Sequence, residues 1–370
     1  MIVKIAMKLS QQKTNLFVVT MVFIVALFVS WNNIQVGFDT TAEYSSKYEH
    51  LYFSQQESIF NNRQCDNNIN DMHERHRLRW VFWQIKKSIY GFSQQYFGYK
   101  GVGAAYVLIH SLFIVIAFLF TYKTTVLLLN FIKKDDNLIS NSNNFSGLKL
   151  IVTLLFLVFF AVTFNGRVSE YTYSIIEAAF VSAAIYFSLK RKVLCFSIVV
   201  AFAVLNRESG FILILMWLLI NKIDAKNLHK SLPLLLPVIV FSLFNYDVLH
   251  CLFQGGFLVT SSPQEGQLTY HVFFDGVSGI IKGGVVLIFN YATYLIPVII
   301  SYMKLKETIS ARVFTPINTI MLIILFYVFI FIIATPLNHM SVKFIIVPLI
   351  VPILSMYIVS LFVNNSDINK

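Results

Sequence analysis

Long apolar runs, separated by short polar and basic breaks, dominate the chain from end to end. A helix needs about 20 apolar residues to cross a bilayer, and most of these runs approach that length. Two neighbouring runs, at 193–205 and 209–221, are shorter and are interpreted as a helix pair inside a bundle. The pattern predicts an all-α fold, a polytopic membrane protein of about ten transmembrane helices in which 1–370 form a single transmembrane domain. The predicted spans are about 16–33, 102–131, 148–164, 171–189, 193–205, 209–221, 232–247, 284–303, 314–334 and 344–363.

The basic residues give these spans an orientation. When the chain is threaded alternately through a membrane, most Lys and Arg residues between the spans fall on one side, and the short loops on the other side hold only Arg167, Arg207, Lys282 and Lys343. Cytoplasmic loops carry such an excess of positive charge. We therefore predict that both termini are cytoplasmic and that two long polar loops, 32–101 and 248–283, lie outside. The Lys- and Asn-rich inner loops are typical of a multi-pass protein of the bacterial inner membrane.

The composition is typical of a membrane protein and argues against a soluble domain or a nucleic-acid-binding protein. Of the 370 residues, 57% are hydrophobic and only 13% are charged, which is not the balance of a soluble domain. The net charge of +11 resides in the breaks between apolar runs, so it is explained by topology and indicates no nucleic-acid partner. The three cysteines form no CxxC pair, and no phosphate-binding glycine motif or metal-binding spacing is present. Any chemistry is expected on the outer side.

The first outer loop begins with two carboxylates close to the membrane exit. Asp39 and Glu43 are four residues apart and would share one helical face. A carboxylate there can act as the base for a hydroxyl that attacks a lipid-borne group, and the two are candidate ligands for a divalent metal. The alternative is that Asp39 caps the following helix. Both interpretations remain open.

A basic amphipathic segment follows in the same loop, from Arg75 to Phe92. Its apolar residues fall on one helical stripe, with Arg75, Arg79 and Lys86 beside it. This pattern predicts an interfacial helix in contact with membrane lipid. Its cations would either hold a lipid-pyrophosphate substrate or anchor the helix to anionic lipid.

Acidic residues accompany the fourth span. Glu170 and Glu177 are seven residues apart, so they project from one face, with Glu177 about 10 Å deeper. A carboxylate at that depth is expected to face the bundle or a wet cavity. Arg167, in the loop before the span, is a candidate partner in a structural ion pair.

The last two polar groups lie at turns. The tip of the short helix pair carries Arg207 and Glu208, which predicts a recessed polar pocket where the guanidinium grips a phosphate, or else a local Arg207–Glu208 pair. His339 and Lys343, in the last outer turn, are interpreted as a proton donor and a phosphate contact, or as a plain polar turn.

Isolated polar residues within the spans receive structural interpretations. His110, in the second span, is expected to be a bundle histidine that forms hydrogen bonds. Tyr291, Tyr294 and Tyr302 are assigned to the aromatic belts at the membrane interfaces.

The order of these features resembles the GT-C superfamily of polytopic glycosyltransferases, which use lipid-phosphate-linked sugars. The resemblance lies in an acidic motif after the first span, a basic outer helix, a short helix pair with a charged tip, and a basic residue before a Pro-containing last span. It implies that Asp39 is the catalytic base or metal-binding carboxylate, with Glu43 as its neighbour, and that Arg207 lies near the donor phosphate. Lys343-Phe344 stands where many members have Arg-Tyr, and the two acidic residues are farther apart than is usual in the family.

The resemblance implies an inverting transfer on the outer face of the membrane. The partners would be a polyprenyl-phosphate-linked sugar and a glycan or lipid-linked acceptor. Two other classes fit the same features: a Wzy-type polysaccharide or O-antigen polymerase, which joins two lipid-linked units, and a flippase or transporter of lipid-linked glycans. A transporter predicts charges midway along several spans, whereas Glu177 is the clear example here.

Overall fold

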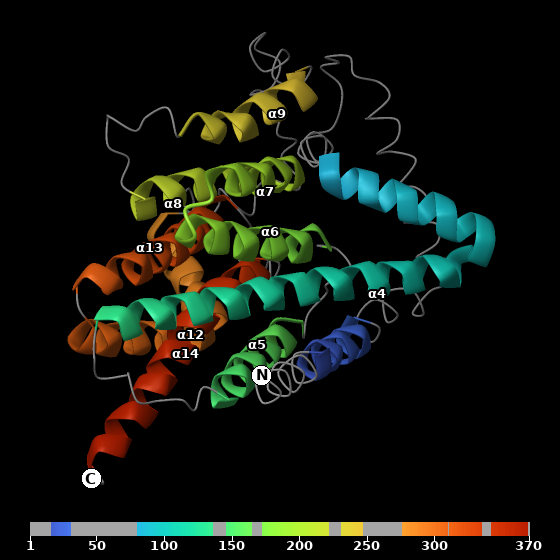
Figure 1. Cartoon of the computed structure of the whole chain (residues 1–370). Coiled ribbons are helices and arrows are strands. Elements are labelled where there is room, and N and C mark those ends of the chain that lie inside the picture. The colour runs from blue at the N-terminus through green and yellow to red at the C-terminus, as the bar shows by residue number, and fades with distance from the viewer. Residues whose placement is uncertain are drawn as a thin grey trace, which may run out of the picture.

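The computed structural model describes residues 16–30, 80–135, 146–164, 172–221, 231–246, 276–309, 311–334 and 342–368. Within these ranges every regular element is a helix, so the all-α prediction is confirmed (Figure 1). After a first helix at Leu16–Ser30, the elements are α4 (Trp80–Asp135), α5 (Ser146–Phe164), α6 (Thr172–Leu189), α7 (Val193–Asn206), the 3-10 turn η3 (Glu208–Phe211), α8 (Ile212–Asn221), α9 (Leu236–Phe244), α12 (Gly276–Thr308), α13 (Ala311–Ala334) and α14 (Val342–Ile368).

The helices coincide with the predicted apolar runs. The runs at 148–164, 171–189, 193–205 and 314–334 match α5, α6, α7 and α13 to within a few residues. By length and composition, one stretch of the described residues, Val107–Phe131 in α4, is long and apolar enough to cross a membrane. Eight further apolar helices of 10–17 residues accompany it. The α7 and α8 helices are, as predicted, too short to cross a bilayer alone.

From Trp80 onward, the basic amphipathic segment is continuous with the second span in one element, α4, rather than forming a separate helix. Figure 1 shows that α4 is sharply bent, between a light-blue first arm and a long teal second arm. The helix contains no proline, and its glycines, Gly91, Gly98, Gly101 and Gly103, are positions at which a helix bends easily. Ile85 of the first arm and Phe113 of the second both pack against Ile176 of α6, so the first arm folds back onto the bundle.

Two helices, α6 and α14, form the centre of the bundle. Small side chains line α6, including Ala178, Ala179 and Ala184, and they let α4, α7, α8 and α14 approach its backbone closely. The middle of α14 is fully enclosed although it contains Pro348 and Pro352. In Figure 1 the helices α9, α7, α6, α4 and α5 follow one another in a stack. The polar residues of α6 therefore lie inside the protein.

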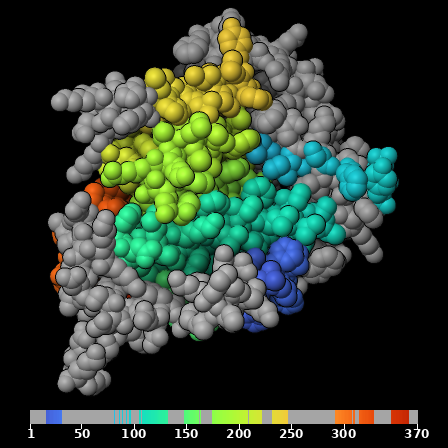
Figure 2. Space-filling view, viewed as in Figure 1, coloured from blue at the N-terminus to red at the C-terminus, as the bar shows by residue number. Residues whose placement is uncertain are grey.

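The outward faces of the helices are strongly apolar. One helical stripe of α4 exposes Leu108, Leu112 and Ile116, and α7 exposes Leu194 and Ile198 in the same one-turn spacing. Figure 2 shows α4 and α7 side by side on one face of the molecule. Large exposed apolar patches mark surfaces that contact a membrane or another protein.

Candidate functional site

The tip between α7 and α8 is a tight turn with its backbone groups satisfied. Arg207 leaves the helical conformation, with φ −163° and ψ 136°, yet its N–H still donates to the carbonyl of Ala203 at 2.8 Å. The Gly210 N–H donates to the Arg207 carbonyl at 2.9 Å. These bonds end α7 and start η3, and they aim the Arg207 side chain away from the hairpin.

Glycine is required at position 210 by a close approach. A Cβ atom built there would lie 2.8 Å from the Ala203 carbonyl carbon and 2.8 Å from the Val204 nitrogen. Both obstacles belong to the backbone of α7, which cannot rotate away. The turn η3 is thus pressed directly against α7, and this contact fixes where Arg207 and Ser209 begin.

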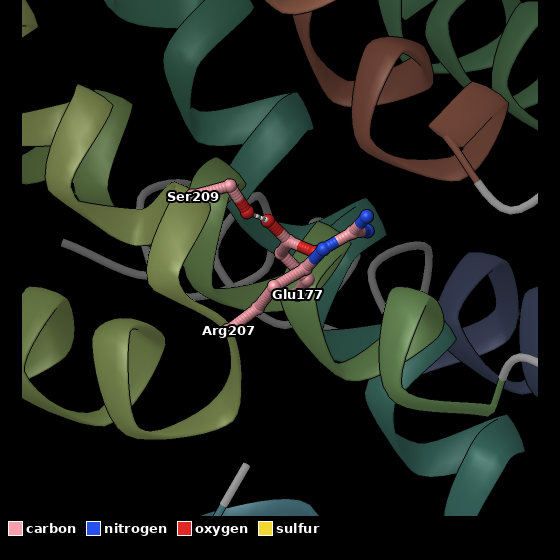
Figure 3. A network of polar contacts seen from close by, with 3 residues as sticks. All are labelled: Glu177, Arg207 and Ser209. Atoms are coloured by element: carbon pink, nitrogen blue, oxygen red, sulfur yellow. Dashed lines mark hydrogen bonds and ion pairs between the residues drawn. The ribbon is translucent and has the colours of Figure 1, made fainter. Parts of the chain in front are cut away.

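Glu177 of α6 meets both of these residues (Figure 3). Arg207 Nη1 donates to Glu177 Oε2 at 3.2 Å, and the Ser209 hydroxyl donates to Glu177 Oε1. The Glu177 side chain is 0% exposed and that of Arg207 is 6% exposed. We call Glu177, Arg207 and Ser209 the hairpin triad. It joins the fourth predicted span to the tip of the short helix pair, so these two candidate groups form one site.

Tyrosines from two further helices lie around the triad. Tyr327 of α13 interacts electrostatically with Glu177 and Arg207, and Tyr291 of α12 interacts with Arg207. One turn beyond Tyr291, Tyr294 forms a hydrogen bond of 2.8 Å with Thr163 at the end of α5. Because the Thr163 hydroxyl already donates to the Phe159 carbonyl, Tyr294 is the donor. Helices α5, α6, α12 and α13 and the hairpin therefore bring polar groups to one region.

The assignment of two tyrosines to the interfacial belts is wrong. Tyr291 and Tyr294 are 6% and 2% exposed, inside the core. Tyr302 lies on the same helix, is less buried and donates to Asn318 at 2.7 Å. The physical reason is that Thr163 supplies a buried acceptor, which removes the cost of placing the Tyr294 hydroxyl in the interior. His110, in contrast, lies inside the bundle as expected.

A second serine extends the polar face of α6 towards its first turn. Ser174 precedes Glu177 by three residues, so the two share one side of the helix. Its side chain is fully buried, and its hydroxyl has no hydrogen-bond partner among the described residues. Buried hydroxyls normally bind a protein group or an ordered water. The Ser174 hydroxyl thus adds a polar atom to the buried face of α6, one turn before Glu177.

The triad is costly to build, and it contains a side chain of the kind that binds anions in proteins. A buried ion pair often stabilises a protein less than apolar side chains of similar volume, because both charges lose their hydration. The guanidinium of Arg207 carries five N–H donors in a planar fork that matches phosphate or carboxylate oxygens. Glu177 and Ser209 hold one edge of that fork in place.

The remaining sequence-predicted residues fall into two groups. Lys343 is the second residue of α14, and Glu208 is the first residue of η3. The other candidates lie outside the described residues: Asp39, Glu43, Arg75, Arg79, Arg167, Glu170 and His339. The described part of the chain contains no group of three or more His, Cys, Asp or Glu side chains arranged to hold a metal.

Sequence reasoning paired Glu177 with Arg167 and Arg207 with Glu208, whereas the structure pairs Glu177 with Arg207. It also missed Ser209, Tyr291 and Tyr327. A signal for Ser209 was present, since it lies two residues after Arg207 at the tip, but nothing in the sequence indicated that α12 and α13 contribute to this region.

Comparison with known proteins adds no relative. No protein-family model, curated protein or solved structure matches this chain.

Proposed function

We propose that this protein is a polytopic glycosyltransferase of a bacterial inner membrane, which transfers a sugar from a polyprenyl-phosphate donor to a glycan or lipid-linked acceptor on the outer face. The main observation behind the proposal is the buried hairpin triad, in which the Glu177 carboxylate holds one edge of the Arg207 guanidinium. Arg207 is assigned to the donor phosphate.

Support for a membrane location comes from two independent features. The outward faces of α4 and α7 carry exposed aliphatic rows where a soluble protein would carry polar side chains. The basic residues collect in the breaks that alternate threading places on one side. A lipid environment explains both, and a helical bundle satisfies its own backbone groups there.

Support for a phosphate ligand comes from the cost of the triad. In lipid, charged side chains are expensive and mark substrate or ion pathways. Glu177 and Arg207 are both enclosed, and they join elements 30 residues apart in sequence. Structural adhesion between α6 and the hairpin needs no charges, because apolar side chains would pack these surfaces at lower cost. Recognition of an anion explains why a guanidinium is kept there.

The proposed transfer uses Asp39 and Arg207 in separate roles. The Asp39 carboxylate accepts the proton of the acceptor hydroxyl, and the hydroxyl oxygen forms a bond to sugar C1. The bond between C1 and the phosphate oxygen breaks, and the phosphate leaves with the electron pair. Arg207 stabilises the charge that develops on this leaving group. Attack opposite the leaving group inverts the configuration at C1.

A transporter of lipid-linked glycans is the second candidate, and one observation favours it. Helices α7 and α8 are short, and their junction carries a buried charge pair, an arrangement that transporters use at binding sites within the membrane. The two functions differ in the fate of the sugar–phosphate bond, which a transporter leaves intact. A Wzy-type polymerase breaks that bond but requires a lipid-linked repeat unit as acceptor.

The proposal is tested on the surface glycan of cells that express single variants. Arg207→Ala and Asp39→Asn should each abolish the glycan product while the protein accumulates in the membrane. Lys190→Ala, in the exposed turn after α6, is the matched control and should leave the glycan unchanged. Normal glycan in both site variants refutes the assignment. Loss of glycan together with accumulation of the intact donor on the cytoplasmic side favours the transporter.

A further inference from the structure

Glu177 has a role beyond holding Arg207 in place. Its Oε2 atom receives the Arg207 Nη1 donor at 3.2 Å, and its Oε1 atom receives the Ser209 hydroxyl, so both carboxylate oxygens are held. The carboxylate is fully buried and lies where an anionic ligand of Arg207 would place its charge. We infer that Glu177 is a built-in competitor, an internal anion that lowers the affinity of Arg207 for the substrate phosphate and so promotes its release. This inference rests on the proposed function.

Charge balance at the triad supports competition rather than assistance. The Glu177 carboxylate offsets part of the positive charge of the Arg207 guanidinium, so a phosphate arriving at Arg207 meets a weaker attraction than a guanidinium without this carboxylate would give. The repulsion between Glu177 and that phosphate acts in a buried region, where water screens it poorly. A residue that only positioned Arg207 could be a neutral hydrogen-bond acceptor, which would not repel the ligand.

The anchoring of Glu177 makes this competition persistent. Ser209 belongs to the same turn as Arg207, and Gly210 presses that turn against the backbone of α7. The carboxylate therefore stays beside the guanidinium when a ligand enters, because α6 and the hairpin fix both partners. A bound phosphate must therefore share the Arg207 guanidinium with the Glu177 carboxylate, because it cannot push that carboxylate away.

The size of the effect follows from Coulomb's law. At an effective dielectric constant of about 20, two unit charges roughly 7 Å apart alter an affinity on the order of fiftyfold. Removing the charge of Glu177 without changing its shape should therefore tighten phosphate binding by a factor of about ten to a hundred. Tighter binding of the leaving phosphate should also slow turnover, lowering kcat and KM together.

The test measures binding of farnesyl phosphate, with farnesol as the uncharged control, to the purified full chain in detergent. Glu177→Gln should bind farnesyl phosphate on the order of fiftyfold more tightly than wild type, with unchanged farnesol binding. Glu177→Asp keeps the negative charge but moves it away from Arg207 by the length of one methylene group. Its affinity for farnesyl phosphate should fall between those of wild type and Glu177→Gln. Because a lone buried arginine destabilises the fold, this second variant also keeps the test decisive if Glu177→Gln does not fold.

Arg207→Gln separates the inference from the function on which it rests. Wild type should prefer farnesyl phosphate to farnesol, and Arg207→Gln should lose that preference. Suppose that Arg207→Gln loses this preference, but Glu177→Gln and Glu177→Asp bind farnesyl phosphate no more tightly than wild type. Glu177 is then only structural, and the competitor role is overturned. If Arg207→Gln binds both ligands as wild type does, the phosphate site and the competitor role fall together.

Discussion

Gly210 offers a direct test of how the hairpin tip is built, because η3 leaves no room for a methyl group at this position. The Cβ atom of Gly210→Ala would stand 2.8 Å from two backbone atoms of α7 and 3.1 Å from the Ala203 Cβ. Non-bonded carbon atoms prefer separations of about 3.5–4.0 Å, so the turn must retreat from α7 by roughly 0.7 Å or more. No rotation of a side chain can absorb the clash.

Two effects of Gly210→Ala should follow. Overpacking of this kind costs about 1–3 kcal/mol of folding free energy. The displaced turn also carries Arg207 and Ser209 away from Glu177, and the Nη1–Oε2 contact is already 3.2 Å long. The variant should therefore lose stability and, because the Glu177 charge is drawn away from Arg207, bind farnesyl phosphate more tightly than wild type.

The assay is thermal unfolding of the purified protein in detergent, combined with binding of farnesyl phosphate. Gly147→Ala is the matched control, because Gly147 lies near the start of α5 and a Cβ atom at this position would meet nothing within 4 Å. Alanine there should leave stability unchanged or raise it by about 0.4–1 kcal/mol. If Gly210→Ala unfolds at the same temperature as Gly147→Ala and binds the ligand equally well, the close approach does not exist.

Three other predictions concern the ion pair, the second hydrogen-bonded pair and the topology. Glu177→Leu or Arg207→Leu alone should cost about 3–5 kcal/mol, whereas the double variant should recover most of it, and strictly additive losses in detergent denaturation would contradict a buried pair. Tyr294→Phe should lower stability by about 1 kcal/mol, and Thr163→Val should cost less when added to Tyr294→Phe than it costs alone, because the hydrogen bond between these two residues is then already lost. In a chain whose three native cysteines are replaced by serine, Lys192→Cys should resist a membrane-impermeant thiol reagent in intact cells and react after permeabilisation, and labelling in intact cells would reverse the orientation.

The helices were predictable from the sequence because most of the apolar runs are longer than the roughly 4–8 residues of a typical strand. The bounds of α5, α6 and α7 follow closely from where Lys, Arg, Asn and Gly interrupt the runs. The continuity of α4 was not predictable in this way. The polar stretch around Gly98 resembles a break between two helices, but it contains no proline and the structure continues through it as one helix.

The site was only partly predictable because its contacts are distant in sequence. Glu177 and Arg207 could each be recognised as costly at their depth, yet each had an opposite charge nearer in the chain, Arg167 or Glu208, and sequence proximity favoured those partners. Tyr294 depends on Thr163, 131 residues away. An amphipathic tyrosine suits an interface or a satisfied interior site equally well, and only packing separates the two.

The close packing of η3 against α7 also offers a way to detect distant homologues. A related fold has to keep Gly210 because there is no room for a side chain, Ser209 for its hydroxyl and Arg207 for its guanidinium. It should therefore retain an Arg-x-Ser-Gly sequence, with an acidic residue 30 positions before the arginine. Whole-chain similarity fades quickly in lipid-facing helices, where any aliphatic residue serves. The short motif should remain recognisable after whole-chain similarity is lost, so two chains that share little else could be aligned on these positions alone.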